Sequence, residues 1–133
     1  MNSFQGIITN IEVSGSLSLV TVHVNDDISL KAIVIETPDT APYLSQGNEV
    51  NVIFKETEVM IALERNLAIS LQNRIDGTID EIEKGELISK VSIHTTAGKV
   101  VSVISTNAIN QLNLRQGTLV TAMIKLNEMM LSV

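Results

Sequence analysis

Two lysines recur at equivalent positions in this chain of 133 residues, and each is followed two residues later by a polar side chain. The pairs are Lys55 with Thr57 and Lys125 with Asn127. A polar segment at residues 70–74 adds hydroxyl, amide and guanidinium groups. These groups offer positive charge and hydrogen bonds, but no pairing of acid with base and no activated nucleophile accompanies them. The pattern favours binding over catalysis, and we expect no enzyme activity.

The chain consists of two copies of one unit. Gly6 aligns with Gly77 and the flanking residues follow at a constant spacing, while Lys55 aligns with Lys125 at a spacing one residue shorter. The change falls in a predicted turn, and turns accept length changes that strands do not. We therefore predict a duplication.

The domain boundaries follow from the repeat. The first unit is expected over residues 1–63 and the second over 70–133, with 64–69 as a connector. The connector contains neither Gly nor Pro, so it does not have the composition of a flexible linker. We expect the two halves to pack against each other.

Short alternating segments bounded by turn residues predict an all-β fold. Each unit is expected to form an OB-like five-stranded β-barrel with one short helix, and a sandwich is the alternative. The helix of the second unit is expected at 106–112, capped by Thr106 or Asn107, and its counterpart at 38–42 is a short helix or a loop. The strands expected in the first unit are 4–13, 17–24, 28–36, 49–55 and 58–63.

Composition restricts the classes of partner. There is no Cys and no Trp, with one Tyr and two Phe among 44% hydrophobic residues, so the core must be aliphatic. Units this small have thin cores, which suggests subunit contacts. The net charge of −6, with nine scattered Lys and Arg, speaks against nucleic acid. No stretch reaches the roughly 20 apolar residues of a membrane span. We expect no membrane partner and a cytoplasmic location.

The order of the motifs resembles the molybdate-binding Mop or TOBE family, whose two-copy members are called molbindins. Residues 70–79, Ser-Leu-Gln-Asn-Arg-Ile-Asp-Gly-Thr-Ile, are similar to the family's Ser-Ala-Arg-Asn-Gln-Leu-x-Gly-x-Ile. Residues 55–60 and 125–130 resemble its Lys-Ala-Ser-x-Val-hydrophobic motif. A Leu-x-x-Gly precedes each of these, at 44–47 and 114–117. The resemblance covers essentially the whole chain.

The resemblance implies a non-catalytic role in binding, storing or buffering molybdate or tungstate, the expected bound ligand. Family members hold the oxyanion at interfaces between units, and two-unit chains are similar to trimers. A homo-oligomer, with a trimer favoured, is therefore expected, and the chain looks like the free-standing kind. The alternative is a structural or regulatory oligomerisation module of the same fold that has lost anion binding.

The motifs also name the residues expected at the anion. Gln72 occupies the place of the motif's Arg, and Arg74, on the same face of a strand, is a candidate to replace its charge. Lys55 and Ser70 are expected to matter more than Lys125, because their segments stay closer to the family pattern. The expected oxyanion-binding residues are Lys55, Thr57, Ser70, Gln72, Asn73, Arg74, Lys125 and Asn127.

Two other recurring residues receive a structural interpretation. His23 and His94 align between the copies, but neither has a second His beside it. We expect interface or surface histidines, and no metal site.

Overall fold

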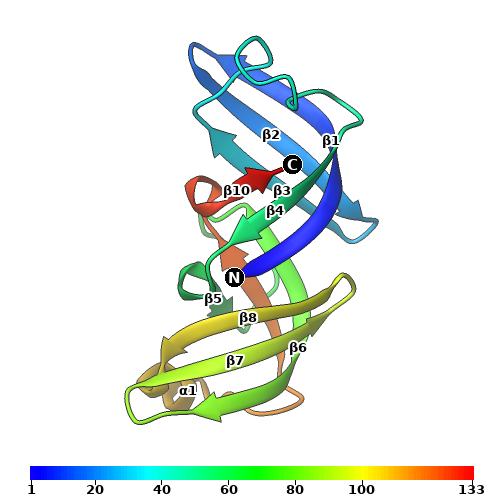
Figure 1. The fold of residues 1–133 in the computed structure, drawn as a ribbon. Helices are drawn as coiled ribbons and strands as arrows, with labels where there is room; N and C mark the ends of the chain where they lie inside the picture. Colours follow the sequence, from blue (N-terminus) through cyan, green and yellow to red (C-terminus); the bar gives the residue numbers. More distant parts are fainter.

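The first strand, β1 (Asn2–Ser14), buries every second side chain along its first half, as its alternating sequence requires. The computed structural model describes residues 1–133. It contains two five-stranded sheets stacked end to end along the molecule (Figure 1). The all-β fold is confirmed.

The two sheets repeat one antiparallel plan. In the first, β1 lies between β2 (Leu17–Asn25) and β4 (Glu49–Phe54), and β3 (Ile28–Val34) pairs with β2. The second repeats this order. Its strands are β6 (Asn73–Lys84), β7 (Ile88–Thr95), β8 (Gly98–Ser105) and β9 (Leu119–Ile124).

The fifth strand of each sheet comes from the other half of the chain. Strand β5 (Met60–Ala62) pairs with β9, and β10 (Met130–Ser132) pairs with β4 (Figure 1). Each crosses over after a 3-10 turn, η1 (Glu56–Glu58) or η2 (Leu126–Glu128). The prediction of five strands per unit is therefore confirmed, but the placement of segment 58–63 in the first unit's own sheet is wrong.

Only the second unit contains an α-helix. Helix α1 (Thr106–Leu112) has the predicted bounds, although its N-cap is Ser105, whose Oγ accepts a hydrogen bond from Ala108 N at 3.1 Å. The expectation of one helix in each unit is wrong, because the corresponding segment between Thr37 and Ala41 forms only turns. Two prolines within 38–42, which lack an N–H group, account for the difference.

A glycine allows the long strands to approach their neighbours closely. A Cβ atom on Gly77 would lie 2.5 Å from the backbone oxygen of His94, and one on Gly6 would lie 2.7 Å from that of His23. Shortly after each glycine the register shifts at a bulge, which bends the strand and lets the sheet curl.

The two halves share one hydrophobic core. Its buried cluster draws on β1, β2, β3 and β4 as well as on β6, β7, β8 and β9. The residues are mainly aliphatic, with one tilted aromatic pair, Phe4 and Phe54, at 6.1 Å between ring centroids. This confirms both the aliphatic core and the packed halves. None of the helices has the length and apolar character needed to cross a membrane.

Candidate anion-binding site

The side chain of Asn73 joins the two halves of the molecule. Asn73 is the first residue of β6, and only 1% of it is exposed. Its Oδ1 accepts a hydrogen bond from Lys31 N at 2.7 Å, and its Nδ2 donates to Lys31 O at 2.8 Å. The amide therefore pairs with the free edge of β3 as the backbone of a neighbouring strand would.

Asn2 makes the equivalent contact from the first unit to the second, with Val101 of β8. Its Nδ2 donates to Val101 O at 2.8 Å, and its Oδ1 accepts from Val101 N at 2.8 Å. Sequence reasoning missed Asn2. The signal was present, because Asn2 precedes Gly6 by the same spacing that separates Asn73 from Gly77.

Pairing of β6 with β9 brings the polar segment 70–73 beside Lys125. Asn73 lies in register with Ile124, so Lys125 follows directly at the start of turn η2. Ser70 and Gln72 are exposed, as is Lys125. We call residues 70–73 and 125–128 together the η2 site. It contains five of the predicted residues: Ser70, Gln72, Asn73, Lys125 and Asn127.

Lys55 and Thr57 occupy the corresponding positions in the first unit, where Lys55 directly precedes turn η1 as Lys125 precedes turn η2. Asn2 is in register with Phe54, and turn η1 packs against β8, where Ser102 Oγ donates to Val59 O at 2.7 Å. We call residues 1–2 and 55–58 the η1 site. The predicted residues other than Arg74 therefore fall into two sets, and the strand pairing that begins at Asn73 connects the polar segment with Lys125, not with Lys55.

Arg74 faces outward with Gln72, as the alternation of the strand predicted. Its guanidinium, however, folds back onto the connector. Nε donates to Leu71 O at 2.8 Å, Nη2 to Ile69 O at 3.0 Å and Nη1 to Arg65 O at 3.3 Å. These bonds fix the path of the connector and use all three nitrogen atoms of the group.

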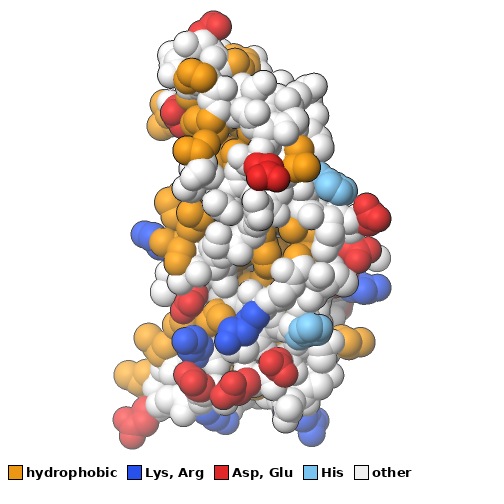
Figure 2. Space-filling view, turned by 45° about the vertical axis from the view of Figure 1, so that its right-hand side comes forward, with side chains coloured by type: hydrophobic (Ala, Val, Ile, Leu, Met, Phe, Trp, Pro, Cys, Tyr) orange, Lys and Arg blue, Asp and Glu red, His pale blue; other side chains and the backbone are white.

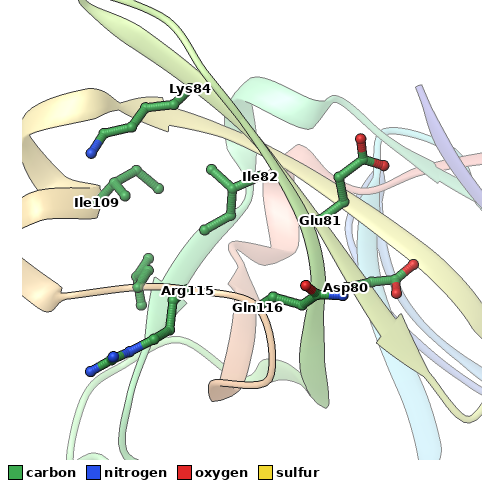
Figure 3. Close-up of a pocket in the computed structure, with 8 residues that line it drawn as sticks. Asp80, Glu81, Ile82, Lys84, Ile109, Arg115 and Gln116 are labelled. Atoms are coloured by element: carbon green, nitrogen blue, oxygen red, sulfur yellow. The ribbon is translucent and has the colours of Figure 1, made fainter.

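Two open clefts are lined by residues outside both sites. One, of about 600 Å³, is formed by β6, the end of α1 and the following loop, and its walls carry acidic and basic side chains (Figure 3). In Figure 3 Lys84 and Arg115 extend away from Asp80 and Glu81, so the cavity does not gather side chains of one charge sign. The other, of about 700 Å³, includes Arg74 among its lining residues.

The sequence comparison agrees with the repeat. Residues 1–61 and 69–131 each match the TOBE domain. The chain belongs to the TOBE domain family. The TOBE match covers both halves and leaves out only the connector region and the last residues.

Relatives of this TOBE chain include both single-unit and longer proteins. It is 33% identical over 66 residues to molybdenum-pterin-binding protein 3 of Clostridium pasteurianum, covering 97% of that protein. It is 25% identical over 133 residues to the molybdenum transport protein ModE of Azotobacter vinelandii and 26% identical over 134 residues to ModE of Herbaspirillum seropedicae. Against these two, 99% of the chain spans 49% and 50% of the relative, about half its length.

A solved structure has the same fold over nearly the whole TOBE chain. The cytoplasmic molybdate-binding protein ModG, in a crystal form with molybdate bound, superposes with a TM-score of 0.92. The alignment covers 99% of this chain and 95% of ModG at 24% identity. The similarity shows that the two proteins share one fold over nearly their whole lengths.

Proposed function

We propose that this chain binds molybdate or tungstate without catalysis and serves as a cytoplasmic store or buffer of the oxyanion. The observation that carries the proposal is the meeting of segments 70–73 and 125–128. Both resemble motifs of the family, they lie far apart in the sequence, and the pairing of β6 with β9 brings them together. Relatives named for molybdenum transport and molybdenum-pterin binding support the same ligand class.

The chemistry of the η2 site suits a tetrahedral dianion. Such an ion is held by donors without bulk, together with cationic groups that strengthen the hydrogen bonds. Ser70 offers a hydroxyl, Gln72 an amide and Lys125 an ammonium group, and all three are exposed. Asn73 is committed to Lys31 through one N–H of its amide, and a primary amide has two.

We further propose that the chain assembles as a trimer, in which neighbouring copies complete the sites. Apolar side chains reach the surface along the length of the molecule, interrupted by charges of both signs (Figure 2). The exchanged strands contribute to this surface, because Met60 and Met130 are 42% and 41% exposed and both strands are sheet edges. Short apolar edges of this kind are suited to burial between subunits.

The proposed function is tested by dialysis of the purified protein against molybdate, followed by elemental analysis of bound molybdenum. We expect retained molybdenum that tungstate displaces and that sulfate displaces only at much higher concentration. Absence of bound molybdenum at millimolar molybdate would contradict the proposal.

The alternative is a structural module that binds no anion, and the hydrogen bonds already made by the Arg74 guanidinium favour it. The nearest residue that could replace the missing motif Arg already donates two hydrogen bonds to the connector and a third to Leu71 O. The alternative predicts the trimer without bound oxyanion, so light scattering combined with the dialysis experiment distinguishes the two.

A further inference from the structure

We infer that the two equivalent sites are unequal, and that Lys31 makes the η2 site the one that takes the oxyanion. This inference rests on the proposed function and adds a residue outside the family motifs. Asn73 contacts the backbone of Lys31, and both the N–H and the C=O of Lys31 form hydrogen bonds with the Asn73 side chain.

Lys31 is fixed beside the η2 site by its backbone. Strand β3 is bordered by Asn73 and by turn η2, which packs against it. The flanking residues Leu30 and Ala32 are buried, so the side chain of Lys31 points to the outer surface of the sheet. Lys31 itself is half-buried, and a lysine can bury its stem while the ammonium group reaches solvent.

No acid neutralises Lys31 within the chain. The ion pairs of the protein involve the Met1 ammonium, His23 and Arg65, and the only side-chain hydrogen bonds at Lys31 are those that Asn73 makes with its backbone. The ammonium group is thus available for an external anion.

The η1 site has no excess of positive charge. The counterpart of Lys31 is Val101, which is 6% exposed and carries no charge. Turn η1 contains Glu56 and Glu58, whereas turn η2 contains Glu128 alone. Together with Lys31, the η2 site therefore combines two lysines with one glutamate, whereas the η1 site combines Lys55 and the Met1 ammonium with two glutamates.

This difference predicts where a dianion binds. Glu56 is engaged by the Met1 ammonium at 3.2 Å, and Glu58 still opposes the charge of Lys55. A site with no net positive charge attracts a dianion poorly, because the negative charges of its glutamates repel the anion and offset the attraction of its cations. We therefore place the oxyanion at the η2 site, and the ranking of Lys55 above Lys125 expected from the motifs is reversed in this proposal.

The test is calorimetric titration of Lys31→Met with molybdate. Methionine keeps most of the unbranched side chain and removes its charge, and loss of a charge-assisted contact corresponds to roughly tenfold or more in affinity. Lys90→Met, on the outer face of β7 beside Glu83, is the matched control with the same change in net charge and is expected to bind as the wild type does.

Three further measurements separate charge from structure. Lys31→Arg should restore most of the affinity, which a purely structural role would not explain, and the defect of Lys31→Met should shrink at high salt. Thermal unfolding verifies that the variants are folded. The double variant Val101→Lys with Glu56→Leu, which copies the η2 site, should add a second class of bound anion.

The outcomes distinguish this inference from the proposed function. If molybdate binds but Lys31→Met and Lys90→Met bind equally well, the inference is wrong and the proposed function stands. If the wild type binds no molybdate or tungstate, both are wrong.

Discussion

Replacement of Asn73 by alanine should destabilise the whole chain, because its amide holds β6 to the edge of β3. The change removes two hydrogen bonds of 2.7 and 2.8 Å and leaves the Lys31 N–H and C=O without partners. Each hydrogen bond contributes about 1 kcal/mol net, and an unsatisfied buried group costs about 1–3 kcal/mol. We expect a loss of about 2–4 kcal/mol in the free energy of unfolding, since water reaches part of the edge.

Urea unfolding and calorimetry measure the effect at fixed protein concentration, because assembly shifts apparent stability. For a chain of this size roughly 3–4 °C corresponds to 1 kcal/mol, so Tm should fall by about 6–16 °C. Asn2→Ala should behave alike, since its bonds to Val101 have the same geometry. Asn66→Ala, at an exposed residue of the connector, is the control and should stay within about 0.5 kcal/mol of the wild type.

An aspartate at residue 73 tests the direction of the two bonds. A carboxylate accepts from Lys31 N but cannot donate to Lys31 O, and burial against that oxygen raises its pKa above the unfolded value. The folded variant then binds the proton more tightly than the unfolded chain, so its deficit relative to wild type should shrink as the pH falls from 7 to 4. A loss below about 1 kcal/mol in both Asn73→Ala and Asn2→Ala would refute the role assigned to the amides.

Three other predictions can be checked directly. Burial and the hydrogen bond from Tyr43 to Glu36, 2.7 Å long, raise the pKa of Tyr43 from 10.0 to about 12, so stability present below pH 10 is lost as the pH rises towards 12. Absorbance of this single tyrosine should show a folded midpoint near 12, and a midpoint near 10 would contradict the assignment. Gln72→Arg should tighten molybdate binding by about tenfold to a hundredfold in calorimetry, because it adds a charged donor; unchanged affinity would argue that the residue is remote from the anion. Light scattering should give three times 14.4 kDa, and a stable monomer at micromolar concentration would exclude the trimer.

The alternating sequence was sufficient to predict most of the strands. Residues such as Phe4 and Ile8 mark the buried face of β1, and the repeat transferred each assignment to the second half. Helix α1 was predicted with its bounds because the segment opens with polar residues that favour a helix start and contains no proline, although the N-cap is Ser105 and not Thr106 or Asn107.

The exchange of β5 and β10 could not be predicted in the same way. Alternation specifies which face of a strand is buried, but it does not specify which of two equivalent sheets receives the strand. Met60 pairs with Met123 in the second sheet, and the same apolar side chains would satisfy the first sheet equally well. The choice is made by the turns η1 and η2, whose backbone path has no strong sequence signal.

The candidate site was predicted in part for a related reason. The motifs predict Ser70, Gln72 and Lys125 as anion-binding residues, whereas Lys31, which we propose in addition, belongs to no motif and has Val101 at its repeat position. Its place beside Asn73 depends on a side-chain contact between residues 42 positions apart. Alignment of the two copies highlights residues that recur, and the charge of Lys31 does not recur because Val101 occupies the equivalent position.

The exchange of strands also determines how the two copies depend on their covalent connection. A tether between two associating units typically acts as a local concentration in the millimolar range. Each sheet here takes its outer strand from the opposite copy, so the connector converts what would be a bimolecular encounter into a folding step that is independent of dilution. A single proteolytic cut beside the exposed Arg65 would leave two interlocked fragments that separate only on unfolding. The duplication thus makes the completion of each barrel insensitive to protein concentration.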